Sequence, residues 1–295
     1  MISLGELQAS IVIDGVGEAQ DALDSVGRSS SQLSSTFEDL TVVAKKALSA
    51  LAIGTTFKEG VTQANALQKA LNSFGAQTGA TTKELDGMKD SIKEIYNNGL
   101  GESFDDIAES MAIVSQQTGA TGEQLEEITS QAMVLRDTFG WDVNESIRAV
   151  NMMMHQFGIT SEEAYNLLAQ GVQNGLDKNG DLLDTINEYS VHYKQLGLDA
   201  EDMFNSLYNG AEAGTFSIDK LGDSMKEFGI RAKDSCTSTI EAYEALGLSA
   251  DNYLARMNEG GEVAEQAMNE ILTALFNCND AVVQNTAGVG LFGRW

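Results

Sequence analysis

A short motif that occurs six times constrains this chain more than any other feature, because each copy predicts the end of one helix and the start of the next. In every copy a glycine precedes an apolar residue and then a Ser, Thr or Asp, and an acidic or amide residue follows three positions later. The copies run from Gly79 to Glu84, Gly119 to Gln124, Gly140 to Glu145, Gly158 to Glu163, Gly197 to Asp202 and Gly247 to Asn252. Glycine readily takes the left-handed conformation that ends a helix. The Ser, Thr or Asp then caps the next helix, and the acidic or amide side chain reaches back to it. We call this pattern the glycine-cap motif.

The spacing of the glycine-cap motif indicates the size of the repeating unit. Successive glycines lie 40, 21, 18, 39 and 50 residues apart, and the longer intervals contain further glycine-containing breaks at 97–101, 175–180 and 210–214. We therefore predict a unit of one helix plus a turn, about twenty residues long, with about ten such helices over 80–278. Short turns make successive helices antiparallel neighbours. The absence of proline and the aromatic content of 7% also favour helices over a β-sandwich.

The chain before the first glycine-cap motif has two different patterns. Residues 1–14 alternate weakly between apolar and polar, which is typical of a short strand, and 16–28 are predicted to form a short helix. Apolar residues then follow a heptad spacing from Leu33 to Leu51, and a second apolar series runs from Phe57 to Phe74 after a slip at Gly54. This predicts a long amphipathic helix over 33–74, which either packs on its own domain or associates with other copies of the chain.

These patterns predict an all-α protein: an array of short antiparallel helical hairpins, preceded by the long amphipathic helix and the strand-like segment. We divide the chain into an N-terminal segment at 1–32, the long helix at 33–76 and the helical array at 77–295.

Charge and composition exclude several classes of function. The formal net charge is −26, and no cluster of Lys and Arg exists that could follow a phosphate backbone, so nucleic-acid binding is not expected. Cys236 and Cys278 are far apart and lack metal-ligand neighbours, which predicts reduced thiols. The N-terminus does not resemble a signal peptide, and the longest apolar stretch, 48–57, is shorter than the roughly twenty residues that span a bilayer. We expect a soluble protein made in the cytoplasm.

Two short motifs resemble ligand sites. Residues 177–188 match positions 1, 3, 5 and 12 of a calcium-binding EF-hand loop, but Leu182 occupies the position of the required glycine. A turn followed by a helix that starts near Asp181 is the favoured interpretation, and a calcium-regulated module is the alternative. Residues 288–293 spell a dinucleotide-binding pattern, but they follow no predicted strand and open no predicted helix.

No residues are predicted to be catalytic, to bind a cofactor or to bind a metal. His155 and His192 are the only histidines, and neither has the spacing of a metal site or a nucleophile–base pair. Acidic pairs such as Asp105-Asp106 point about 100° apart on a helix and cannot form one site locally. Met152 to Met154 are predicted to be core residues. We therefore predict that the chain is not an enzyme.

An ordered run of motifs resembles one protein family. The run contains Gln117-Thr118-Gly119-Ala120-Thr121, Phe139-Gly140-Trp141-Asp142, Phe157-Gly158-Ile159-Thr160, Asp181-Leu182-Leu183-Asp184, Asn187-Glu188-Tyr189-Ser190, and Gly214 to Asp223 followed by Lys226, Phe228 and Arg231. Over roughly residues 75–295 the chain resembles the core region of phage tail tape measure proteins of long-tailed phages and their prophages.

The resemblance implies a structural virion protein. Such proteins lie inside the tail tube, set tail length while tube subunits polymerise around them, and are thought to assist genome delivery. The implied partners are the tail-tube protein, tail-assembly chaperones and tail-tip or baseplate proteins, and no catalytic residues are implied. The family continues beyond a segment like 291–293, so we expect an N-terminal portion or a disrupted prophage copy, with membrane contact only in regions that this chain lacks. The alternative is an acidic helical scaffold or adaptor that binds partner proteins in the cytoplasm.

Overall fold

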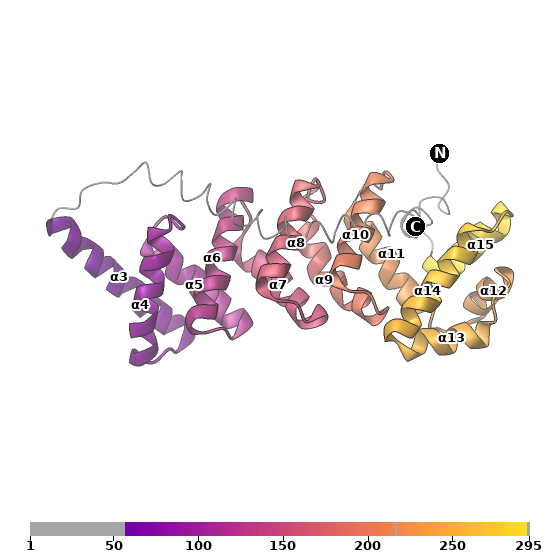
Figure 1. Ribbon diagram of the computed structural model, residues 1–295, viewed down its shortest axis with the longest axis horizontal. Coiled ribbons are helices and arrows are strands. Elements are labelled where there is room, and N and C mark those ends of the chain that lie inside the picture. The colour runs from indigo at the N-terminus through magenta and orange to yellow at the C-terminus, as the bar shows by residue number, and fades with distance from the viewer. Residues whose placement is uncertain (1–56, 216, 294–295) are drawn as a thin grey trace. The chain divides into compact units, whose positions relative to one another are not determined.

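The computed structural model describes residues 57–215 and 217–293, and over these ranges the chain is all-α, as predicted (Figure 1). Thirteen helices and no strand are present in the described chain. They are α3 (Phe57–Thr78), α4 (Thr82–Asn97), α5 (Phe104–Thr118), α6 (Gly122–Phe139), α7 (Val143–Phe157), α8 (Ser161–Gln173), α9 (Leu182–Gln195), α10 (Ala200–Glu212), α11 (Ile218–Arg231), α12 (Thr237–Ala245), α13 (Ala250–Glu259), α14 (Gly261–Phe276) and α15 (Ala281–Phe292). The predicted strand-like segment, the helix at 16–28 and the first part of the long helix lie outside the described residues.

All six glycines of the glycine-cap motif lie between two helices, as predicted. Their φ angles are all left-handed, at 74° for Gly79, Gly158 and Gly247, 72° for Gly119, 76° for Gly140 and 92° for Gly197. An L-residue with a Cβ rarely adopts such an angle, so the glycine is required by the backbone of the turn.

The side-chain half of the motif forms at four of the six turns. Reciprocal capping boxes join Thr81 to Glu84, Thr160 to Glu163 and Asp199 to Asp202. The Asp142 carboxylate accepts hydrogen bonds from the N–H groups of Asn144 and Glu145. The side chains of Thr121 and Ser249 form no capping hydrogen bond.

The chain divides into two compact units, which are described separately. The described part of the first unit comprises 57–151 and 160–169, and the described part of the second comprises 152–159, 170–215 and 217–293. The domain boundaries predicted at 32 and 76 stay predictions.

In the first unit α3 packs on α5 and α4 packs on α6, two places along the chain, and α3 to α6 also pack on their direct neighbours. The contacts of α3 with α5 are the most extensive, and α4 packs on both α5 and α6. Leu67, Ala70, Leu71 and Phe74 of α3 are at most 4% exposed. The last part of the 33–74 apolar seam, from Leu67 to Phe74, is therefore buried inside its own unit, whereas Ala64 is exposed.

In the second unit α9 packs most extensively on α11, and the last described helix, α15, packs on earlier helices. Helix α15 lies against both α11 and α12, while α13 pairs with α14. Tyr193, Phe228, Tyr243 and Leu275 are fully buried in this unit. Among the described helices, none is long and apolar enough to cross a membrane.

Candidate functional site

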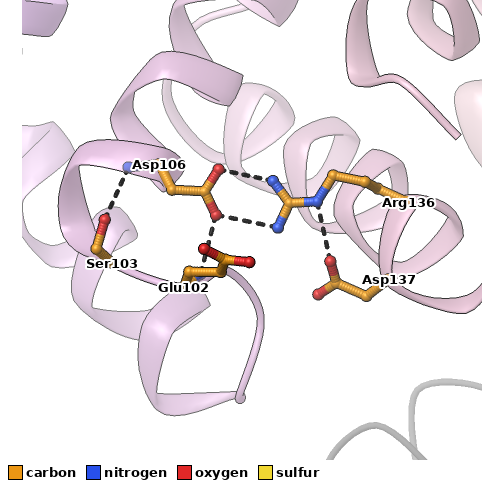
Figure 2. Close-up of polar contacts among 5 residues, drawn as sticks. All are labelled: Glu102, Ser103, Asp106, Arg136 and Asp137. Carbon is orange, nitrogen blue, oxygen red and sulfur yellow. Dashed lines mark hydrogen bonds and ion pairs between the residues drawn. The ribbon is translucent and has the colours of Figure 1, made fainter. Parts of the chain in front are cut away.

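Arg136, near the C-terminal end of α6, donates three hydrogen bonds to carboxylates in the first unit. Figure 2 shows its guanidinium facing Asp106 of α5, with Nη1 at 2.7 Å and Nη2 at 3.0 Å from the two carboxylate oxygens. Its Nε donates to Asp137 at 2.9 Å. The N–H of Glu102 donates to Asp106 at 2.9 Å, and Ser103 caps α5 by accepting from the Asp106 N–H at 3.2 Å. The pair thus ties the start of α5 to the end of α6.

The contacts of this pair stabilise the charged form of both side chains. Burial alone would raise the pKa of Asp106, but the hydrogen bonds from Arg136 and from the Glu102 N–H outweigh it and hold the pKa below its usual range. Burial likewise works against the charged form of Arg136, and its hydrogen bonds to Asp106 and Asp137 raise its pKa. The geometry is that of a bidentate structural clamp, and neither group is poised for proton transfer.

In the second unit, several residues of the tape-measure-like motifs meet between α9 and α11. The ring of Tyr189 lies directly on Gly222, and its hydroxyl donates to Asp219 at 3.1 Å. Lys226 pairs with Glu188 at 3.2 Å, and its Nζ lies 5.7 Å from the centre of the Tyr189 ring. Burial, followed by the charge of Asp219, raises the pKa of Tyr189 well above its usual range. These contacts join α9 to α11.

The EF-hand-like segment is a turn followed by a helix, as the favoured interpretation predicted. Helix α9 starts at Leu182, directly after Asp181, and the Leu182 N–H donates to the Asp177 carboxylate at 3.1 Å. Ser217, at the start of α11, donates to Asp181 at 2.8 Å. Two of the carboxylates that a calcium loop would use are thus bonded to donors of the protein. No group of three or more His, Cys, Asp or Glu residues in the described ranges could hold a metal ion.

The glycines of the dinucleotide-like pattern lie within the last described helix or at its end. Gly288 and Gly290 lie inside α15, and Gly293 ends it with φ at 86°. A Cβ on Gly290 would come within 2.9 Å of the Ser238 carbonyl oxygen and of the Ala242 Cβ. Glycine therefore permits the close approach of α15 to the first residues of α12.

The remaining candidate residues are not brought together by the fold. His155 is exposed on α7, and burial lowers the pKa of His192 on α9. Cys236 and Cys278 are free and partly exposed. Asp105 and Asp106 point to different partners as predicted, since Asp105 pairs with Lys69 at 2.7 Å while Asp106 binds Arg136.

Sequence reasoning identified Asp105-Asp106 but missed Arg136. One signal could have found it: Arg136 is the only Lys or Arg between Lys93 and Arg148, in a stretch rich in Asp and Glu. A lone cation in such a stretch is a natural partner for a partly buried carboxylate.

Comparison with known proteins assigns the chain to a family. The model of a family described as phage-related minor tail protein matches residues 96–293, about two-thirds of the chain. Neither the curated proteins nor the solved structures gave a significant match. The family match includes the Arg136 clamp and the whole α9–α11 contact. The chain belongs to the phage-related minor tail protein family, and its role is that of a structural component of a phage tail.

Proposed function

We propose that this protein is a tail tape measure protein, or a part of one, which sets tail length and templates assembly of the tail tube. The family match over 96–293 carries the proposal, because it coincides with the ordered motifs that resemble the tape measure core. Its site of action would be the interior of the tail tube in the virion, after synthesis in the host cytoplasm. A contribution to genome delivery belongs to the same proposal.

The proposed role is non-enzymatic. The charged groups described above are engaged with each other, as in Arg136 with Asp106 and Lys226 with Glu188, and these contacts hold helices together. The partners we propose are the tail-tube protein, tail-assembly chaperones and tail-tip or baseplate proteins. Self-association through the 33–74 helix would have to use residues before Leu67, because Leu67, Leu71 and Phe74 are buried within the first unit.

Tail length tests the proposal. In-frame deletions and duplications of helical stretches are introduced into the phage gene that encodes this chain, and tails are measured by electron microscopy. A ruler requires tails that shorten with deletions and lengthen with duplications. The matched control is Gly87→Ala, which leaves the chain length unchanged and is made at an exposed helix position where an added Cβ meets nothing within 4 Å.

Tails of unchanged length in phage that assemble normally would contradict the ruler. The protein would then be tail-associated without measuring. In that case the acidic scaffold becomes the better proposal, since a protein with a net charge of −26 is suited to bind partner proteins through their basic surfaces.

A further inference from the structure

Helices α3 to α10 are connected by two kinds of junction: one follows each odd-numbered helix and the other follows each even-numbered helix. The junctions that follow odd-numbered helices recur at a nearly constant interval. Gly79, Gly119, Gly158 and Gly197 join α3 to α4, α5 to α6, α7 to α8 and α9 to α10. Each of these glycines follows the one before it by about 40 residues, a spacing within the range of known helical repeats. Gly140 joins α6 to α7 and is therefore a junction of the other kind. In α3 to α6 the repeating unit is thus a two-helix hairpin, which combines two of the predicted units of one helix plus a turn, and the spacing of the glycines continues to α10.

Many equivalent positions of the first two hairpins are buried in both copies. Eight pairs of residues offset by 40 are buried in both copies: Leu67 and Ile107, Ala70 and Ser110, Leu71 and Met111, Phe74 and Val114, Met88 and Ile128, Ser91 and Gln131, Ile92 and Ala132, and Ile95 and Leu135. The pentapeptide at 77–81 is also identical to that at 117–121. The two hairpins thus share a set of buried positions, and the second also buries Ala108, Ala112, Thr129 and Val134, whose equivalents in the first hairpin are exposed.

Equivalent hydrogen bonds form at the two identical pentapeptides. Thr78 donates to the Phe74 carbonyl at 2.8 Å, and Thr118 donates to the Val114 carbonyl at 2.7 Å. Each threonine also accepts from an alanine N–H two residues later. The hydrogen bonds of Thr78 and Thr118 are therefore copied along with the sequence, whereas the cap of the following helix forms at Thr81 and not at Thr121.

Polar contacts between hairpins recur at a similar offset. The Gln116 side chain of α5 donates to the Gln77 carbonyl at the end of α3, at 2.9 Å. In the second unit, Lys233 after α11 donates to the Gln195 carbonyl at the end of α9, at 3.2 Å. In both cases the last turn of one odd-numbered helix is capped by a side chain from the next odd-numbered helix or from the residues directly after it.

We propose that the two-helix hairpin is an exchangeable module, so that the array can lose or gain whole hairpins and keep its fold. Arrays in which each repeat contacts mainly its neighbours behave in this way, because removing one repeat brings two equivalent faces together. Removing a single helix does not bring equivalent faces together, because every later helix then runs in the opposite direction.

The proposal has a consequence for length, and this part rests on the proposed ruler function. A single extended helix of about 40 residues would span about 60 Å. A hairpin packed through its n to n+2 contact advances the stack by one interaxial distance, about 10 Å. Each module would therefore contribute far less length than the same residues drawn out as one helix.

The first test compares two deletions in the full chain. Deleting 79–118 removes one whole hairpin, joins Thr78 to Gly119 and restores the pentapeptide Gln-Thr-Gly-Ala-Thr, with α3 in the place of α5. The matched control deletes 119–139, which removes α6 alone and joins Thr118 to the intact glycine-cap motif at Gly140. Helicity by circular dichroism and cooperativity of urea unfolding are measured for both.

We expect the 79–118 deletion to remain helical and to unfold cooperatively, and the 119–139 deletion to lose cooperative unfolding. The unfolding midpoint of the 79–118 deletion should fall, because Ala66 then occupies the place of Asp106 and Arg136 loses its partner. A duplication of 79–118 keeps Asp106 and should retain cooperative unfolding. The proposal is overturned if both whole-hairpin variants lose cooperative unfolding, or if the 119–139 deletion unfolds as cooperatively as the 79–118 deletion.

Phage that carry the 79–118 deletion test the length consequence. Tails should shorten by about 10 Å, the advance of one packed hairpin, rather than by about 60 Å, the length of one extended helix. Shortening by about 60 Å would contradict the inference that a packed hairpin adds only one interaxial distance to the tail. If tail length responds to no deletion or duplication anywhere in the gene, the ruler function fails, while the unfolding results still decide whether the hairpin is a module.

Discussion

Replacing Gly222 by alanine tests the contact between α9 and α11 most directly. Gly222 is buried in α11, and the ring of Tyr189 lies against it. An added Cβ would come within 2.6 Å of Tyr189 Cγ and 2.7 Å of Cε2, distances that no unstrained pair of carbon atoms adopts. The ring has little freedom to move away, because Tyr189 is only 3% exposed and its hydroxyl is bonded to Asp219.

The size of the effect follows from two opposing terms. Alanine is favoured over glycine inside a helix by about 0.8–1 kcal/mol. Forcing an extra methyl group into a filled core costs about 1–3 kcal/mol, and an aromatic ring held on both sides belongs at the upper end. We expect Gly222→Ala to lower the free energy of unfolding by about 1–2 kcal/mol, a sign opposite to that of helix propensity alone.

Gly87→Ala is the matched control. Gly87 also lies inside a helix, α4, but it is exposed and an added Cβ would meet nothing within 4 Å. Only the propensity term applies there, so this variant should be more stable than the wild type by about 0.5–1 kcal/mol. Urea unfolding followed by circular dichroism gives both values, provided that the slope of the transition is unchanged.

The same substitution made in a Tyr189→Ala variant tests whether the Tyr189 ring causes the loss of stability. When Tyr189 is already alanine, the Gly222→Ala change should become neutral or stabilising, because the clash no longer exists. The reasoning is refuted if Gly222→Ala is as stable as the wild type, or if it remains equally destabilising without the tyrosine ring.

Two further substitutions test the charged groups. Asp106→Asn should lower the free energy of unfolding by about 1–3 kcal/mol at neutral pH, because Arg136 is left partly buried without its charged partner. Since folding lowers the pKa of Asp106, this loss of stability should vanish as the pH falls through that pKa. Urea unfolding at neutral pH and at about pH 3 measures the loss. An equal loss at both pH values would contradict the role of the charged carboxylate. Desolvation, together with the charges of Asp199 and Glu265, raises the pKa of Asp202 to about 6. The wild type should therefore gain stability as the pH falls through about 6. At neutral pH Asp202→Asn should be more stable than the wild type by less than about 1 kcal/mol, since solvent screens the cluster, and a less stable variant in the same assay would contradict the assignment.

Local chemistry made the turns predictable from the sequence. Gly79 and its equivalents end helices because only glycine takes the required φ without strain, and this preference does not depend on what the turn packs against. The same locality explains why Asp105 and Asp106 could be predicted to diverge, since the geometry of one helix sets the angle between adjacent side chains.

Partners distant in the sequence could not be predicted in the same way. The approach of Arg136 to Asp106 depends on α6 packing beside α5, and the role of Gly290 depends on how closely α15 crosses the start of α12. Patterns of spacing within one segment contain no information about such distances. The sequence could therefore argue against a cofactor site at residues 288–293, but it could not predict their role in packing.

The amino-acid sequence by itself determined that this protein is a chain of helices, where six of the junctions lie, and which family it resembles. The helices and their junctions depend on backbone preferences and capping groups that act within a few residues. Only the tertiary structure decided that the helices repeat in pairs, as hairpins with equivalent buried faces. That distinction depends on which apolar face meets which, and α3 buries Leu67, Leu71 and Phe74 while packing most extensively on α5 rather than on the helix that directly follows it.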